Sequence, residues 1–238
     1  MTSHNYEQYS LSNTKWEEKI PSHWQVKRLR FVAEVLSSNV DKKTIIDETP
    51  VKLCNYTDVY YHDHITSEID FMQATATDNE IDKFRLQSND VVITKDSETP
   101  DDIGVPTLIV EDIEKLICGY HLAIIKAIPN VSYGPYLFYF FKSVFCSSQL
   151  EVAAKGVTRF GLSLEAIKSL SITLPPVEEQ KLIVQYLNSK MSQIDKLGLL
   201  IGAGSKEKDI SHHSLSGLLI EYRSALITNA VIGKIKVV

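Results

Sequence analysis

The most regular pattern of apolar and polar positions lies in residues 169–197. Residues 169–174 alternate and contain β-branched side chains, so they predict a strand that ends before the two prolines at 175–176. Two glutamates at 178–179 then occupy the place where the first turn of a helix favours negative charge. The apolar positions that follow recur in steps of four and three: Ile183, Leu187, Met191, Ile194 and Leu197. They predict a long amphipathic helix whose apolar stripe needs a partner helix from this chain or another one.

A second apolar period begins at Ile210 and continues towards the C-terminus. It includes Leu215, Leu218, Leu219, Tyr222, Leu226 and Ile227. Three glycines interrupt the chain between the two periods: Gly198, Gly202 and Gly204. The pattern predicts two helices joined by a glycine-rich hinge.

The residues before this region predict a mixture of short strands and helices. The predicted strands, in chain order, cover residues 24–28, 51–54, 59–61, 91–94, 105–110 and 121–128. The predicted helices cover residues 29–36, a segment capped by Thr77 or Asp78 and ending at Phe84, a buried aromatic-rich stretch at 135–149, and a short segment capped by Ser163. Because strands and helices mix without a regular βαβ rhythm, the expected fold class is α+β.

Three parts are expected along the chain. Residues 1–19 are a polar leader, residues 20–175 form a globular domain, and residues 176–238 form a helical arm. Two stretches of the globular domain are candidate binding loops. Residues 95–104 form a polar loop longer than a simple connection between strands requires, and residues 157–161 form a loop bracketed by glycines.

Composition narrows the class of protein. The 238 residues are 44% hydrophobic and 23% charged, which is ordinary for a globular protein, and no apolar run approaches the roughly eighteen residues that span a bilayer. The N-terminus lacks a basic segment followed by an apolar one, so a cytoplasmic protein without membrane association is expected. The net charge of −5 does not indicate a nucleic-acid-binding protein, so any basic surface must be local.

The sequence lacks the arrangements of side chains that a catalytic site or a metal site requires. Cys54, Cys118 and Cys146 have no C-x-x-C spacing and are expected to be buried thiols. His62 and His64 flank an aspartate, but their polar surroundings favour a solvated turn over a metal site. Residues 174–177, Leu-Pro-Pro-Val, lack the polar residue and the aromatic ring with which an amino-methyltransferase holds its base. No catalytic residue and no metal are therefore expected.

Several segments together resemble the specificity (S) subunit of type I restriction–modification systems. They are IPSHWQVKRL, SNDVVITKDSETPDDIGV, KGVTRFGLS, LPPVEEQKLIVQYLNSKMSQIDKL and EYRSALITNAVIGKI, in the order of the family. The resemblance implies a mixed α/β target-recognition domain over residues 20–175, followed by a long, coiled-coil-like helical arm. Family members typically have two such domains, so this chain resembles a half-length form, either a natural half-subunit or a fragment. The segment 198–217 is less regular than the family's usual helix.

The same resemblance implies a function without catalysis. Such a subunit recognises double-stranded DNA and positions methyltransferase (M) and restriction (R) subunits on a bipartite site. It needs no cofactor of its own, because S-adenosylmethionine and ATP are expected on the partner subunits only. The alternative is a helical scaffold that does not bind DNA and whose globular head binds protein; binding to random duplex DNA that weakens with salt would argue against it.

Candidate DNA-binding residues follow from the two loops. Lys155, Thr158 and Arg159 suit phosphate contacts, whereas Lys95, Asp96 and Ser97 suit base edges. Asn55 and Tyr61 are weaker candidates for reaching bases. A single exposed Lys or Arg is ordinarily just a solvated charge, and it is the resemblance that favours DNA contact here.

The arm is expected to bind M subunits and a second copy of the chain. The expected interface residues are Ile183, Leu187, Ile194, Leu215, Leu219, Tyr222 and Leu226. Left exposed, these side chains would form a large apolar surface. The two helices of the arm would cover each other if they fold back as a hairpin, but pairing with a second copy would also place two readers at opposite ends of a two-fold bundle. A homodimer of this kind would recognise two inverted half-sites.

Overall fold

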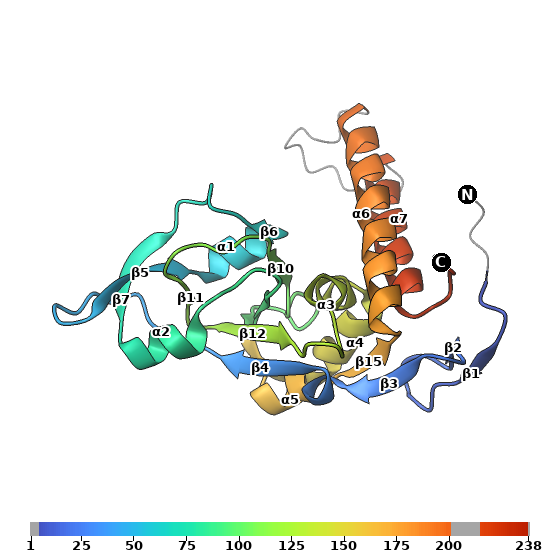
Figure 1. The fold of residues 1–238 in the computed structure, drawn as a ribbon, viewed down its shortest axis with the longest axis horizontal. Helices are drawn as coiled ribbons and strands as arrows, with labels where there is room; N and C mark the ends of the chain where they lie inside the picture. Colours follow the sequence, from blue (N-terminus) through green and yellow to red (C-terminus); the bar gives the residue numbers. More distant parts are fainter. Residues whose placement is uncertain (1–4, 201–214, 238) are drawn as a thin grey trace.

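The computed structural model describes residues 5–200 and 215–237. A mixed α/β body carries the long helix α6 (Val177–Leu200), which rises from one side of it with α7 (Leu215–Val231) alongside (Figure 1). The expected α+β class and the long helix after the body are confirmed. No described helix has both the length and the apolar character that crossing a bilayer requires.

The largest sheet has five strands in the order β4–β12–β8–β10–β6. Neighbouring strands are antiparallel except β10 and β6, which are parallel. The bounds are β4 (Ala33–Ser37), β6 (His64–Ile65), β8 (Val91–Thr94), β10 (Pro106–Ile109) and β12 (Leu122–Ala127).

The alternation of side chains along these strands divides the hydrophobic interior in two. In β8, Val91 and Ile93 pack into one cluster with residues of the helices α3 to α7. Val92, between them, packs into a second cluster with residues of the three-stranded sheet β11–β5–β7. Successive side chains of a strand point to opposite faces, so one buried strand serves both clusters. The sheet is therefore covered on both faces.

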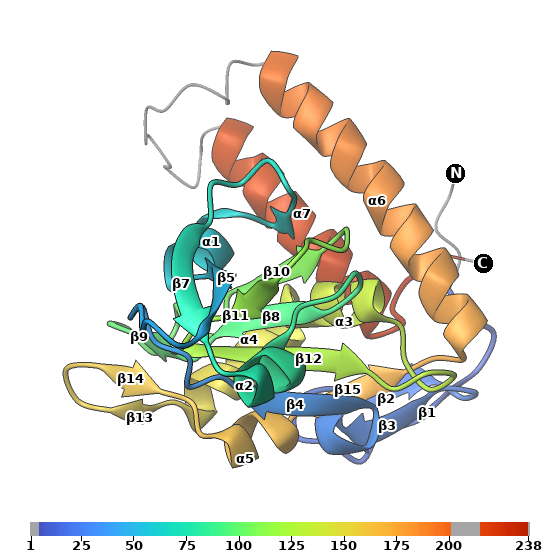
Figure 2. The same ribbon diagram turned by 60° about the vertical axis from the view of Figure 1, so that its left-hand side comes forward.

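Smaller sheets surround it. They are β1–β2 (Tyr9–Leu11, Lys19–Pro21), β15–β3 (Ser171–Leu174, Gln25–Arg28), β11–β5–β7 (Leu116–Cys118, Thr49–Cys54, Met72–Ala76) and β13–β14–β9 (Lys155–Gly156, Phe160–Gly161, Asp96–Ser97). The β13–β14 hairpin projects from the edge of the body (Figure 2).

The remaining elements are helical. They are the 3-10 helix η1 (Leu29–Phe31) and the helices α1 (Tyr56–Tyr61), α2 (Asp78–Phe84), α3 (Gly134–Phe141), α4 (Val144–Ala153) and α5 (Leu164–Lys168). Thr77 caps α2 and Ser163 caps α5, and β15 ends directly before α6, all as expected.

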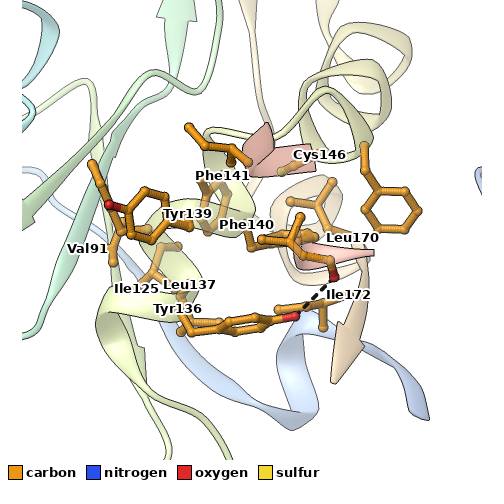
Figure 3. Packing of buried hydrophobic residues seen from close by; sticks show 14 of the residues in the cluster. Val91, Ile125, Tyr136, Leu137, Tyr139, Phe140, Phe141, Cys146, Leu170 and Ile172 are labelled. Atoms are coloured by element: carbon orange, nitrogen blue, oxygen red, sulfur yellow. Dashed lines mark hydrogen bonds between the residues drawn. The ribbon is translucent and has the colours of Figure 1, made fainter. Parts of the chain in front are cut away.

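Helix α3 is the centre of the main hydrophobic cluster. Every one of its residues is buried, and its aromatic rings pack between the sheet and the segment around Leu170 and Ile172 (Figure 3). The hydroxyl of Tyr136 donates to the carbonyl of Thr173, 2.8 Å away, so this phenol is satisfied although it is fully buried. The cluster also contains residues of α6 and α7, so one core continues from the body into the base of the arm.

Two predicted elements near the N-terminus are wrong. Residues 59–61 form the end of helix α1 and not a strand, because Asn55 and Asp58 provide the start of a helix: the amide of Asn55 donates to Asp58 Oδ2 at 2.7 Å. Residues 29–36 do not form one helix: only residues 29–31 are helical, as η1, and residues 33–37 pair with β12 as strand β4. The ladder with a strand about ninety residues away overrides the local pattern.

Three further expectations are corrected. The stretch 135–149 is divided into α3 and α4 at Ser143, whose hydroxyl accepts from the amide of Cys146. Of the loop predicted at 157–161, residues 157–159 connect a hairpin, whereas residues 160–161 are its second strand and pair with residues 155–156. Gly198 of the predicted hinge lies inside α6, whereas Gly202 and Gly204 of the hinge, and Ile210 at the start of the second apolar period, lie outside the described residues.

Candidate nucleic-acid interface

A cleft of about 690 Å³ opens where α1, the segment 96–102 and the β13–β14 hairpin meet. Its lining consists almost entirely of aromatic, acidic and hydroxyl side chains: Tyr56, Thr57, Tyr60, Tyr61, Asp96, Ser97, Glu98, Thr99, Asp102, Tyr120, His121, Thr158 and Arg159. A concave surface with several convergent polar groups is the usual form of a binding site.

Helix α1 supplies one wall of the cleft. Tyr56 and Tyr60 are one helical turn apart, and their rings stack at 5.6 Å between centroids and 16° between planes. Tyr61 meets the edge of Tyr60 at 5.0 Å. The phenol of Tyr60 donates to Asp102 Oδ2 at 2.7 Å, and this hydrogen bond, reinforced by burial, raises the pKa of Tyr60 to about 12. The stacked rings are therefore held in place from across the cleft.

The residues directly before β12 supply another part of the lining. His121 Nδ1 is hydrogen-bonded to Asp96 Oδ2, and the ring centroid of His121 lies 4.1 Å from that of Tyr120. The backbone binds the same elements together, because the amide of Lys95 donates to the carbonyl of His121 at 2.9 Å. Asp96 is thus fixed by its side chain and by its neighbour's backbone.

The hairpin forms the rim. Phe160 pairs with Ser97 and Gly161 with Asp96, so β14 lies antiparallel to the short strand β9 and the hairpin forms one sheet with it. Residues 157–159 connect the two strands of the hairpin and are exposed. Burial raises the pKa of Tyr56, Asp102 adds to this effect, and Arg159 opposes it, which puts Arg159 close enough to act on the cleft electrostatically.

The charge of the cleft is uneven. Asp96, Glu98 and Asp102 make its interior acidic, whereas the cations Lys155 and Arg159 are exposed on the hairpin. Carboxylates repel phosphate but accept hydrogen bonds from amino groups, including the exocyclic amino group of cytosine in the major groove. The arrangement suits phosphate contacts at the rim and base edges inside.

The structure brings together five of the eight residues that the sequence suggested for DNA contact. The five that line the cleft are Tyr61, Asp96, Ser97, Thr158 and Arg159. Lys155 is exposed on β13, outside the lining. Lys95 is half-buried, and its ammonium donates to Ser37 Oγ at 2.5 Å. Ser97 is mostly buried, with 8% of its surface exposed, so its contribution is chiefly to the β9–β14 ladder.

The suggestion that Asn55 reaches bases is corrected. Only 8% of its surface is exposed, and it occupies the N-cap position of α1, where it holds the helix that carries the tyrosines.

Residues that the sequence did not single out complete the site. They are Tyr56, Tyr60, Asp102, Tyr120 and His121. The spacing of Tyr56 and Tyr60 is a signal, but only if residues 56–61 are recognised as a helix. Nothing in the sequence places Tyr120 beside them.

The apolar stripe near the body is covered within the chain, because the two helices of the arm pack against each other, which was one of the two alternatives left open by the sequence. Ile183 and Leu187 are fully buried, Ile194 is 5% exposed and Leu226 is 8% exposed, because α7 and α3 cover them within the same chain. These four residues are not available to a second copy. Leu219 is half-buried, while Leu215 and Tyr222 are exposed.

Apolar surface remains at the end of the arm that points away from the body. A groove of about 530 Å³ lies between α6 and α7 there and is lined by Ile194, Asp195, Gly198, Leu199, Ser216, Leu219, Ile220 and Arg223. Leu199, Leu200 and Leu215 are each at least 66% exposed around it. Most of the exposed apolar side chains of the described arm lie at this end.

The three cysteines are free and buried, as expected, and burial raises the pKa of each thiol. Within the described ranges, no group of three or more His, Cys, Asp or Glu side chains is placed to hold a metal ion. His62 approaches the carbonyl of Asp58, and the ring of His64 lies 5.6 Å from that of Phe138.

Comparison with known proteins identifies the family. Residues 21–199 match the family described as type I restriction modification DNA specificity domain. The chain belongs to this family. The resemblance seen in the sequence is therefore confirmed, and the matched range contains the whole cleft and all but the last residue of helix α6.

One curated relative and two solved structures extend this result. The putative type I restriction enzyme MjaX specificity subunit of Methanocaldococcus jannaschii is 23% identical over 214 residues, which are 89% of this chain and 48% of the relative. A chain from a structure on complex assembly and conformational transition of the type I R-M system has a TM-score of 0.59 at 16% identity, covering 94% of this chain and 49% of that one. The HsdS subunit from Thermoanaerobacter tengcongensis has a TM-score of 0.54 at 17% identity, covering 94% and 48%.

These likenesses establish a shared fold. They also show that the chain spans about half the length of the relatives it matches. A half-length form with one recognition domain agrees with this coverage.

Proposed function

We propose that this chain is the DNA-recognition subunit of a type I restriction–modification complex and that it reads sequence with the tyrosine-lined cleft and the β13–β14 hairpin. One observation carries the proposal beyond the family match. The two loops that the sequence suggested for DNA contact, 95–97 and 155–159, are joined in a single sheet beside one cleft. Residues far apart in sequence thus converge where recognition needs both phosphate and base contacts.

The proposed roles of the hairpin and of the cleft are different. Lys155 and Arg159 are exposed cations and would contact phosphates, which fixes the position of the protein on the duplex. Asp96 and Tyr61 face the cleft and would meet base edges. Asp96 is already oriented by His121, so it would bind without first losing side-chain freedom.

The chain would contribute no catalytic group. It would hold M and R subunits on the site, and the cofactors S-adenosylmethionine and ATP would be bound by those subunits.

The decisive experiment uses the chain purified together with the M subunit encoded in the same system. With S-adenosylmethionine, the complex should methylate adenine at one defined sequence, which sequencing of modified bases would map. The M subunit without the chain should methylate nothing specifically. Methyl transfer by the chain alone, or the same methylation pattern with and without it, would refute the proposal.

A two-fold homodimer would supply the second recognition domain that a bipartite DNA site requires. Since the stripe near the body is covered, the exposed end of the arm is where a second copy would pair. We expect Leu215→Glu with Leu218→Glu to prevent pairing, because both side chains are more than half exposed there. Leu182→Glu is the control: it adds a charge at an exposed leucine near the other end of α6.

Sedimentation analysis measures the outcome. The unchanged chain and the control should be dimeric and methylate inverted half-sites with M subunit present, and the double variant should be monomeric. A monomeric unchanged chain together with an asymmetric mapped site would instead indicate one half of a two-domain subunit.

A protein-binding head is the second candidate. The acidic, tyrosine-lined interior of the cleft favours it, because cations of a partner protein suit such a surface. Binding of random duplex DNA distinguishes the two functions. A DNA reader binds it with an affinity that falls steeply with salt, whereas a protein adaptor does not bind it.

A further inference from the structure

Val157 stands at the tip of the β13–β14 hairpin with 90% of its surface exposed. It has two exposed cations as neighbours, Lys155 two residues before it and Arg159 two residues after it. Tight turns usually contain Gly, Asn, Asp, Pro or Ser, whereas this three-residue connection reads Val-Thr-Arg. Packing within the described part of the chain gives no reason for a β-branched apolar residue at this place.

The backbone holds this residue outward. Gly156 pairs with Phe160 and has φ +155°, and a Cβ at Gly156 would lie 2.0 Å from the carbonyl oxygen of Arg159. Only glycine permits so close an approach of the two strands. The hairpin is in turn anchored to β9 through the Phe160–Ser97 pair. Val157 is therefore presented by a tightly closed ribbon and not by a free loop.

A two-stranded ribbon fits the major groove of B-DNA, which is about 12 Å wide, but not the minor groove, which is about 6 Å wide. In the major groove the one apolar group on a base edge is the C5-methyl of thymine. We propose that the hairpin enters the major groove and that Val157 reads a thymine through its methyl group, while Lys155 and Arg159 contact phosphates on the two sides. This inference rests on the proposed function of DNA recognition.

Deoxyuridine tests the contact, because it pairs like thymidine but lacks the methyl group. The chain, in complex with its M subunit, first selects duplexes from a library with a randomised centre. Each thymidine of the selected site is then replaced singly by deoxyuridine, and affinities are measured for the unchanged chain and three variants. The variants are Val157→Ser, Thr158→Ser, which removes the neighbouring methyl group, and the control Val144→Ser.

Val144 is a suitable control because it is also an exposed valine but lies at the other end of α4, next to Thr228 of α7. At one position, deoxyuridine should weaken binding by the unchanged chain about fourfold, the effect of one methyl group returned to water. Val157→Ser should bind the thymidine duplex about fourfold more weakly and show no further loss with deoxyuridine. The control should behave like the unchanged chain, and Thr158→Ser should keep the fourfold sensitivity to deoxyuridine whatever its overall affinity.

Three results would overturn the inference while leaving DNA recognition intact. They are a selected site without thymine, equal sensitivity of Val157→Ser and the unchanged chain at every position, and loss of sensitivity in Thr158→Ser instead. Absence of any selected sequence would contradict the proposed function itself. The two failures are thus distinguishable.

Discussion

Phe160 lies opposite Ser97 in the ladder between β14 and β9, although the two residues are 63 positions apart in the sequence. This pair joins the hairpin to the segment that carries Asp96, so the rim and the interior of the cleft form one unit. A change in the hairpin should therefore alter the cleft.

The first prediction compares two glycines. Gly156→Ala should disrupt the hairpin, because the added Cβ would lie 2.0 Å from the carbonyl oxygen of Arg159 at a φ of +155°. Gly198→Ala is the matched control: it lies in α6, and a Cβ added there would have no neighbouring atom of the described chain within 4 Å. This change should stabilise the helix by about 0.5–1 kcal/mol.

Hydrogen exchange and urea unfolding measure the two effects. In Gly156→Ala the amides of β13 and β14 should exchange faster and sequence-selective DNA binding should fall, whereas Gly198→Ala should keep both. Unchanged exchange of the hairpin in Gly156→Ala would contradict the close approach at this glycine.

The second prediction concerns phosphate contacts. Arg159→Ala and Lys155→Ala should each weaken binding to all duplex sequences about equally and reduce the slope of log affinity against log salt by about one. Lys83→Ala in α2 is the control, because its side chain is exposed but packs over Phe84 away from the cleft. Fluorescence anisotropy at several salt concentrations gives the slopes. A change of sequence preference with an unaltered slope would show that Arg159 reads a base instead.

The third prediction concerns the arm. Leu187 is fully buried between α6, α7 and the body, so Leu187→Ala should lower the free energy of unfolding by about 2–5 kcal/mol. Leu182 lies on the same helix but is 42% exposed, and Leu182→Ala should cost about 0.5 kcal/mol or less. Urea unfolding measures both. Similar values for the two variants would mean that α7 does not cover this face of α6.

The fourth prediction follows from the pKa of Tyr60. Its hydrogen bond to Asp102 raises the pKa to about 12, compared with a value near 10 for an unfolded tyrosine. The neutral phenol is thus favoured in the folded state. The stability from this contact is fully present below about pH 10 and is lost as the pH rises through 12.

An ultraviolet titration of tyrosine detects the effect. The difference between the unchanged chain and Tyr60→Phe should show one phenol ionising near pH 12, and Asp102→Asn should move this ionisation towards 10. Tyr139, whose pKa burial also raises to about 12, should titrate alike in all three proteins. A difference curve centred near 10 in the unchanged chain would contradict the Tyr60–Asp102 contact.

Elements with local causes were predictable from the sequence. The strand β15 ends and α6 begins at the prolines 175–176 because proline removes backbone donors and sets φ for a first helical turn. Thr77 and Ser163 start α2 and α5 by accepting hydrogen bonds from amides three residues ahead. The loops 95–104 and 157–161 were also predicted as candidates from their length, glycines and family resemblance.

Elements with distant causes were not predictable in this way. Residues 33–37 are a strand only because β12 lies beside them, and residues 59–61 belong to a helix whose start lies in what reads as a turn. The apolar stripe of α6 was predicted, but the sequence did not decide what covers it. In the structure, α7 and α3 of the same chain pack against the stripe and cover it.

The sequence by itself determined the α+β class and the long helix and marked two loops as candidates for binding, because each depends on residue types at short spacing. It also carried the resemblance that the family match confirms. The position and the lining of the cleft depend on the tertiary structure alone. The walls of the cleft come from residues 56–61, 96–102, 120–121 and 158–159, and only the folded sheets bring them together. The tertiary structure also decided that Asn55 is buried at the start of α1 and that Val157 faces outward, because burial and exposure depend on neighbours that are distant in sequence.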